Sequence, residues 1–255
     1  MSAKIAIVGG TDVQRLAEVL RVRPVEVETP FGEAQVHLGE GELGDLAVVL
    51  RHGPDHGLPS HRVNYRANLK ALSLLGVTRV VATYSVSSLD EELEPGGVMV
   101  PDQFIDLTGT ASTFLDAEPN GAVAADVSEP FCSGLAELLA ARAEAGGLTV
   151  RNRGTCICRN GARNETKAEV RMLRQFGGDV VGHSACPETA LARELGLHYA
   201  GLAVAAEWAA GVGGDRRVDR QQLARVRSRL LPPILDALRE EDLPACRCRE
   251  RIAAP

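Results

Sequence analysis

The sequence predicts an α/β fold rather than a β-sandwich. Short apolar runs alternate along the chain with stretches of helical periodicity, a pattern typical of strands and helices that share one core. Several of the apolar runs end in glycine or hydroxyl-bearing residues, as strands of α/β proteins do where they enter a loop. The 255 residues contain no internal repeat and no linker. We therefore expect a single domain over residues 1–255, with 240–255 as a loosely ordered tail.

The expected strands are short apolar runs. Residues 5–8 lead into Gly9-Gly10, and residues 46–50 end at Arg51. Continuous apolar runs of this length are typical of strands that are buried on both faces. The other expected strands cover residues 80–84, 97–100, 104–105, 179–181 and 199–205.

The expected helices carry apolar side chains at helical spacing. The first begins near Ser60 or His61 and stops at Gly76. Others are expected over residues 165–176 and 187–195, and the last begins near Asp219. Its Pro232-Pro233 pair should kink or split it, because proline cannot donate an interior helix hydrogen bond. Residues 111–126 show no strong period and are expected to form a long loop.

Charge and composition restrict the partners of the chain. The net charge of −6 and the pI near 5.6 argue against a nucleic-acid-binding surface, since a polyanion is normally bound by a basic face. No apolar run is long enough to span a bilayer, and the N-terminal segment lacks the apolar core of a signal peptide. We expect a cytoplasmic protein whose partners are small molecules, with no nucleic acid and no membrane.

The six cysteines are expected to be reduced thiols. They lie at positions 132, 156, 158, 186, 246 and 248, in a chain that does not resemble a short secreted, disulfide-rich domain. The two Cys-x-Cys pairs lack the Cys-x2-Cys spacing of zinc knuckles, so no metal site is expected. Cys246 and Cys248 would form either a small strained disulfide or exposed thiols on a frayed end.

Small or hydroxyl-bearing residues follow expected strands at Gly9-Gly10-Thr11, Arg51-His52, Tyr84-Ser85 and His183-Ser184. If these strands share one sheet, their ends converge on one crevice. Backbone N–H groups, hydroxyls and a guanidinium together bind an anion such as phosphate. Arg51 is the strongest of these signals, because a buried arginine needs an anionic partner.

Several segments, in order along the chain, carry a resemblance to a known family. They are IAIVGGT (5–11), ETPFG (28–32), RHG with PSHRVNYRANLKAL (51–72), DQFID (102–106), EPFC (129–132) and PETALARELGLHYAGLAV (187–204). The chain resembles the trimeric purine nucleoside phosphorylase family, most closely its methylthioadenosine and methylthioinosine phosphorylase branch. This resemblance implies a three-layer phosphorylase/hydrolase-like fold with a mixed, partly barrel-like central sheet flanked by helices. It also implies a homotrimer or a dimer of trimers.

The resemblance further implies a pentosyltransferase of purine metabolism that cleaves the N-glycosidic bond of a nucleoside with phosphate. Inorganic phosphate is the co-substrate, no cofactor is required, and the products are a free base and a sugar 1-phosphate. The transition state resembles an oxocarbenium ion, as in glycoside hydrolysis. The enzyme must therefore place phosphate beneath the sugar and stabilise negative charge on the departing base.

The phosphate half of the family site is largely retained. The residues that match phosphate-binding positions are Thr11, Arg51, His52, Ser85 and Ser184. Arg51 and His52 are also expected to act in catalysis, and Ser85 lies in the turn that offers backbone N–H groups to phosphate. Tyr84 stands where a threonine is usual, and Asp12 replaces a glycine close to the phosphate loop.

The base half departs from the family pattern. The residues expected to contact base or sugar are Arg163, Asn164, His183, Glu207 and Trp208. Asn164 replaces a stacking phenylalanine, and His183 replaces a methionine that packs beneath the sugar. Glu207 and Ala209 occupy the positions of two base-reading aspartates, so the second carboxylate is lost. The histidine that a neighbouring subunit offers to the 5′ end of the sugar corresponds to Ala124.

Three of these residues have two interpretations each. Glu207 is expected to be catalytic through a hydrogen bond to a base nitrogen, or else to be a structural carboxylate paired with an arginine. Arg163 is a structural arginine in the family, or reads a pyrimidine carbonyl as in uridine phosphorylases, although its Gly161-Ala162-Arg163 spacing is one residue shorter than that pattern. His183 bonds a sugar hydroxyl or a 5′ group, or is a packed core histidine.

The favoured substrate is a 5′-modified, methylthioinosine-like 6-oxopurine nucleoside. Adenine needs an acceptor for its exocyclic amine, and Ala209 cannot supply one. The alternatives are a phosphorylase of a 5′-modified uridine, a phosphate-independent hydrolase or other chemistry at the anomeric carbon, and an inactive nucleoside-binding homologue. Asp12 motivates the second, because a carboxylate near the phosphate loop repels a dianion; the lost carboxylate would suit the third.

Overall fold

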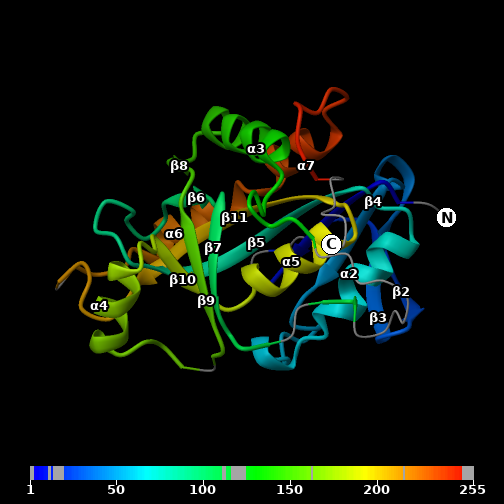
Figure 1. The fold of residues 1–255 in the computed structure, drawn as a ribbon. Coiled ribbons are helices and arrows are strands. Elements are labelled where there is room, and N and C mark those ends of the chain that lie inside the picture. Colours follow the sequence, from blue (N-terminus) through cyan, green and yellow to red (C-terminus); the bar gives the residue numbers. More distant parts are fainter. Residues whose placement is uncertain are drawn as a thin grey trace.

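The computed structural model describes residues 3–10, 13, 20–110, 113–115, 125–161, 163–214 and 216–248 (Figure 1). An eleven-stranded mixed sheet forms the middle of the molecule. Its strands are β1 (Ile5–Gly9), β2 (Val22–Thr29), β3 (Gly32–Gly39), β4 (Leu46–Leu50), β5 (Arg79–Ser88), β6 (Val98–Val100), β7 (Gln103–Leu107), β8 (Val150–Asn152), β9 (Thr155–Arg159), β10 (Val180–Gly182) and β11 (His198–Trp208).

Helices cover both faces of this sheet (Figure 1). They are α2 (Tyr65–Leu74), α3 (Ser133–Ala145), α4 (Lys167–Gln175), α5 (Ala185–Glu194), α6 (Arg220–Ser228) and α7 (Leu231–Arg239), with short 3-10 turns η1 (Gly41–Leu43) and η2 (Ser60–Arg62). One large apolar cluster includes the buried side chains of α2 and α5, and a second includes those of α3 and α7. The predicted three-layer α/β architecture is thus confirmed. No helix in the described ranges is long and apolar enough to cross a bilayer.

The strands expected from apolar runs are all present, although the bounds of most of them differ from those expected. Strand β4 has the expected bounds, whereas β5 and β11 each extend beyond theirs. The hairpin of β2 and β3 was not predicted from the sequence. In β2, charged residues alternate with Val25 and Val27. This alternation is typical of strands with one solvated face. The short strands β8 and β9 and helix α3 were not predicted either.

The last helical stretch is split, as its proline pair predicts. Helix α6 is capped by Asp219, whose side chain accepts hydrogen bonds from the next turn, and it ends at Ser228. Helix α7 then begins at Leu231, so that Pro232 and Pro233 occupy its first turn. Proline is tolerated there because those N–H groups have no partner within the helix.

One edge of β5 is unpaired over part of its length, which leaves a gap in the sheet. Strand β11 pairs with β5 along its whole length on one edge. On the other edge, β1 pairs with β5 only as far as Ala82, and β10 pairs only from Ser87 onward. Residues 83–86 therefore face neither neighbour on that edge. Tyr84-Ser85 was predicted to follow a strand end, which is wrong, because β5 continues to Ser88 and the crevice opens beside its middle.

Candidate active site

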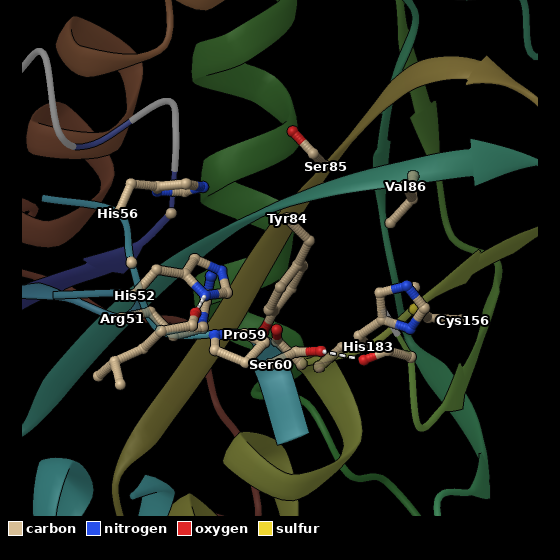
Figure 2. A pocket seen from close by; sticks show the side chains of 17 residues that line it. Arg51, His52, His56, Pro59, Ser60, Tyr84, Ser85, Val86, Cys156 and His183 are labelled. Carbon is tan, nitrogen blue, oxygen red and sulfur yellow. Dashed lines mark hydrogen bonds between the residues drawn. The ribbon is translucent and has the colours of Figure 1, made fainter. Parts of the chain in front are cut away.

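A cavity of about 570 Å³ lies at the gap along β5 (Figure 2). Its lining includes seven of the residues predicted to converge, namely Gly10, Arg51, His52, Tyr84, Ser85, His183 and Ser184. They come from the loops after β1, β4 and β10 and from β5 itself. A cavity of this size accommodates a small ligand. The expected convergence on one crevice is therefore seen in the structure.

Arg51 is held by a buried carboxylate on α5. Its Nε and Nη2 donate to the two carboxylate oxygens of Glu188 at 2.5 and 2.8 Å, and its Nη1 donates to the carbonyl of Thr83 at 3.0 Å. The exposed fractions are 3% for Arg51 and 0% for Glu188. Burial alone would lower the pKa of Arg51, but the charge and hydrogen bonds of Glu188 outweigh it and raise that pKa. The guanidinium is thus permanently charged and fixed at the cavity wall.

Glu188 is the main site residue that the sequence analysis missed. It was predicted that a buried Arg51 needs an anion, and this internal carboxylate is one. The sequence does carry a signal, because Glu188 stands among small and apolar residues over 185–192. An acidic residue that becomes buried in such a segment needs a partner. The sequence alone does not show which partner lies 137 residues away.

Two tyrosines extend the network around Arg51. Tyr199 donates from its hydroxyl to Glu188 at 2.7 Å, and the hydroxyls of Tyr84 and Tyr199 also bond to each other. Because a carboxylate only accepts, the Tyr199 O–H is directed to Glu188, and Tyr84 is the donor to the Tyr199 oxygen. Burial raises the pKa of both tyrosines, so they remain protonated. The Tyr84 ring also lies 5.2 Å from the guanidinium carbon of Arg51. Tyr84, where threonine is usual, therefore supports Arg51.

His52 presents an oriented imidazole to the cavity. Its Nδ1 lies 2.8 Å from the carbonyl oxygen of Leu58, which can only accept, so Nδ1 carries a proton. Burial and then the charge of Arg51 lower the pKa of His52, which favours the neutral ring. A Cβ on Gly10 would lie 2.9 Å from the His52 ring. Gly10 therefore lets the ring pack against the backbone that follows β1.

We expect phosphate to raise the pKa of His52, because a bound dianion favours the charged imidazole. An NMR titration of the histidine ring signals should give a pKa below the usual histidine value without phosphate and a higher one at saturating phosphate. His37 on β3 is the matched control, since burial also lowers its pKa and it does not line the cavity. If both pKa values stay fixed while phosphate binds, His52 does not contact phosphate.

The N-terminus of α5 points its first turn at the same cavity. Ser184 is the N-cap residue, and its side chain makes no capping bond to the helix. The Ser184 hydroxyl lies instead 3.4 Å from the Tyr65 hydroxyl, and Ser184 and Ala185 both line the cavity. The partial positive charge of a helix N-terminus favours an anion. Arg51 and this helix end are thus two independent attractions for a negative ligand.

Ser85 faces the gap through its backbone. Alternate residues of a strand direct their backbone groups to the same edge. The Thr83 carbonyl reaches Arg51 on the gap side, so the Ser85 N–H points to that side too. The Ser85 side chain lies on the opposite face of β5 from Tyr84 (Figure 2). It accepts from Nη2 of Arg227 on α6 at 3.0 Å, which brings a second arginine, missed by the sequence analysis, near the cavity rim.

The opposite wall of the cavity is formed by His183 and the loop that reaches Gly161 (Figure 2). Nδ1 of His183 donates to the carbonyl of Arg159 at 2.9 Å. A Cβ on Gly161 would collide with the His183 ring. From the other side, Ser60 and His61 contact the Gly161 carbonyl at 3.5 and 3.1 Å. His183 is therefore packed and bonded at one side, as its structural interpretation expects, and lines the cavity at the other. A bond to a sugar hydroxyl or a 5′ group stays a prediction.

Glu207 and Asn164 meet just beyond this lining. The Glu207 carboxylate accepts from Nδ2 of Asn164 at 3.1 Å and from Oγ of Ser87 at 3.2 Å. Ser87 follows Val86, which lines the cavity. A register shift between Ala205 and Glu207 gives β11 a bulge at this point, and bulges redirect side chains. Among the described contacts of Glu207 there is no arginine. The expected pairing of a structural Glu207 with an arginine is therefore not seen.

Trp208 and Arg163 are not among the residues that line the cavity. The Trp208 ring packs in a separate apolar cluster and beneath Arg216, whose guanidinium carbon is 5.2 Å from the ring centre. Arg163 is exposed and donates to both carboxylate oxygens of Glu169 at 2.9 and 2.7 Å. This pairing agrees with a structural arginine. A base or sugar contact of either residue stays a prediction.

Other predicted positions fall outside the described residues. They are Thr11 and Asp12 at the phosphate loop and Ala124 at the expected 5′ position. Ala209, in contrast, is described: it is 4% exposed, and its N–H donates to the Ser88 carbonyl. Its methyl group offers no acceptor to a base.

Comparisons with known proteins identify the family of the chain. The model of the phosphorylase superfamily matches residues 4–235. The 6-oxopurine nucleoside phosphorylase of Pyrococcus furiosus is 41% identical over 219 residues, which are 84% of this chain and 82% of the relative. The S-methyl-5′-thioadenosine phosphorylase of Pyrococcus horikoshii is 42% identical over 228 residues, 88% of this chain and 85% of the relative.

A solved structure gives the same result for the fold. The methylthioadenosine phosphorylase of Schistosoma mansoni in complex with tubercidin superposes with a TM-score of 0.84 at 29% identity, covering 93% of this chain and 91% of the other. The resemblance seen in the sequence is therefore confirmed. From its sequence, its fold and the superfamily match, the chain belongs to the phosphorylase superfamily.

Proposed function

We propose that the chain is a nucleoside phosphorylase that cleaves the N-glycosidic bond of a 6-oxopurine nucleoside with inorganic phosphate. The observation that carries this proposal is the anion site at the gap of β5, where Arg51, His52 and the N-terminus of α5 surround one cavity. Two relatives are named 6-oxopurine nucleoside phosphorylase and S-methyl-5′-thioadenosine phosphorylase, which supports the reaction class. A homotrimer, which the family resemblance implies, is part of the same proposal.

Phosphate is placed by groups of two kinds. The α5 N-terminus supplies positive potential, and the Arg51 guanidinium, the Ser85 N–H and the Ser184 hydroxyl supply hydrogen bonds at the cavity wall. Since Glu188 already balances the charge of Arg51, the guanidinium acts chiefly as a fixed donor. Rigid donors of this sort cost no reorganisation when charge develops in the transition state. Phosphate held there would attack the anomeric carbon of a sugar that extends toward His183.

The departing base is assigned to the side of Glu207 and Asn164. Negative charge that develops on the base is stabilised by a hydrogen-bond donor near its ring nitrogens. Glu207 and Asn164 form a carboxylate–amide pair. The pair lies beside Ser87, one residue beyond the cavity-lining part of β5. Together they offer both acceptor and donor groups to a base edge.

A 6-oxopurine is favoured over adenine because Ala209 supplies no acceptor for an exocyclic amine. We also propose that a 5′-methylthio group is accepted, which the name of the Pyrococcus horikoshii relative supports.

We expect inosine and 5′-methylthioinosine to react at least about 10²-fold faster, in kcat/KM, than adenosine and 5′-methylthioadenosine, because an unpaired amine is costly to bury. Each pair differs only at position 6 of the base, so it is its own control. Base release in saturating phosphate, measured by chromatography, gives the ratio. Equal rates for both members of a pair, or a preference for 5′-modified uridines, would overturn the base assignment.

A further inference from the structure

Four potential metal ligands from distant parts of the chain meet at the start of β11. Cys132 is the N-cap residue of α3, and His198 is the first residue of β11. Cys246 and Cys248 lie on the segment that follows α7. Their ligand atoms all lie within 4.8 Å of one another. The cluster is therefore assembled by the fold and not by a local sequence motif.

The spacing of these atoms fits one tetrahedral ion. Nδ1 of His198 lies 3.2 Å from Sγ of Cys246 and 3.6 Å from Sγ of Cys132. Zinc bonds of about 2.3 Å to sulfur and about 2.0 Å to nitrogen put neighbouring ligands of a tetrahedron roughly 3.5–3.8 Å apart. The separation from Cys132 lies within this range, and the separation from Cys246 lies slightly below it. Small side-chain rotations would suffice to bring all four atoms to one ion.

The sulfur atoms are sheltered from solvent. Cys132 and Cys248 are 1% and 2% exposed, and Cys246 and His198 are half-buried. All the cysteines are free thiols. The expected alternative of a disulfide between Cys246 and Cys248 is therefore not seen. The alternative of exposed thiols is wrong for Cys248, which is buried.

The segment that carries the last two ligands is fixed independently of them. The carbonyl of Pro244 approaches Gly134 so closely that a Cβ there would collide with it. Nη1 of Arg79 donates to the carbonyl of Leu238 at 3.1 Å and also to that of Glu240. The thiols are thus presented to α3 and β11 by backbone contacts, which reduces the entropy lost when an ion binds.

We propose that Cys132, His198, Cys246 and Cys248 bind one structural Zn²⁺ ion. Three thiolates and one imidazole form the Cys3His donor set of structural zinc sites, and soft sulfur ligands in tetrahedral geometry select zinc over hard cations. Four protein ligands complete the coordination and leave no position for water. The ligand nitrogen is Nδ1, because it is the ring atom that lies against the sulfurs. The Cys-x-Cys spacing argued against a metal site because the other two ligands, Cys132 and His198, are distant from this pair in the sequence.

The ion would join the C-terminal segment to α3 and β11, outside the cavity lining. His198 stands five residues from Ala203, which pairs with the cavity-lining Tyr84, and five residues span about 16 Å of extended chain. Binding to the folded state alone stabilises it. We therefore expect the ion to raise the unfolding temperature and to leave the rate of catalysis unchanged.

The test uses the full chain, purified under reducing conditions without chelator. Elemental analysis should find one zinc per chain, and Co²⁺ in its place should show thiolate charge-transfer bands and the ligand-field bands of a tetrahedral site. Removal of the ion by a chelator should lower the Tm by several degrees and leave kcat/KM unchanged at low temperature. This comparison keeps the test valid if a ligand variant fails to fold.

Variants assign the ligands. Cys248→Ser and His198→Ala should each lose stoichiometric zinc and change the Co²⁺ spectrum, whereas Cys186→Ser, a buried thiol at the start of α5, should keep one ion per chain. Three results would overturn the proposal. The first is that the reduced protein takes up no zinc. The second is that the cluster cysteines are isolated as a disulfide and, after its reduction, still bind no ion. The third is that both ligand variants retain one zinc per chain.

Discussion

Replacing Arg51 with alanine is expected to lower kcat/KM for phosphate-dependent cleavage by about 10³-fold, because it removes a fixed charged donor from the attacking anion. The guanidinium lies at the cavity wall, locked by Glu188 and by the Thr83 carbonyl. The loss should appear in the KM for phosphate as well as in kcat. Steady-state kinetics with varied phosphate measures both.

The same change should destabilise the fold, because it strands the Glu188 carboxylate at 0% exposure. Breaking a buried ion pair typically costs about 3–5 kcal/mol in the free energy of unfolding. The double variant Arg51→Met with Glu188→Gln removes both charges and should regain most of that stability while staying inactive. Urea denaturation separates the two effects. Activity within tenfold of the parent in either folded variant would show that Arg51 does not bind phosphate.

Replacing Glu207 with alanine is expected to lower kcat by about 10²- to 10³-fold, the range of an acid–base group in a transition state. The KM for phosphate should change little, because Arg51, His52 and the α5 N-terminus remain in place. This split between kcat and the phosphate KM distinguishes a contact to the base from a general disturbance of the site. Rates at saturating phosphate with inosine give the value.

Two further variants control for the Glu207 result. Glu207→Gln keeps the shape and the bond from Asn164 but removes the charge, so it reports on charge alone. Glu92→Gln removes a carboxylate whose side chain is 88% exposed and should behave like the parent. If Glu207→Ala weakens phosphate binding and leaves turnover intact, then Glu207 does not serve the base.

The residues of the proposed phosphate side were largely predictable from sequence because each contribution is local. Gly10, Arg51 and Ser184 each follow an apolar strand, and strand ends in one sheet converge. What local patterns do not contain is pairing between distant segments. Glu188 lies 137 residues from Arg51, and the gap along β5 depends on where β1 stops and β10 begins.

The other misses have different physical causes. The hairpin of β2 and β3 does carry a readable period-2 alternation, but its charged residues mask the apolar content. The base side was harder, since Asn164 meets Glu207 as a pair whereas the neighbouring Arg163 turns outward to Glu169. Loop conformation decides that difference, and no periodicity encodes it. The thiol cluster likewise exists only after α3, β11 and the C-terminal segment have packed together.

The most direct test of the central claim is phosphate dependence of base release. The full chain is incubated with inosine, 5′-methylthioinosine and 5′-modified uridines, with and without phosphate, and base and sugar 1-phosphate are followed by mass spectrometry. A phosphorylase releases base only with phosphate and forms one sugar 1-phosphate for each base. Base release without phosphate would indicate a hydrolase, and nucleoside binding without turnover would indicate an inactive homologue. Either result would contradict the proposed function.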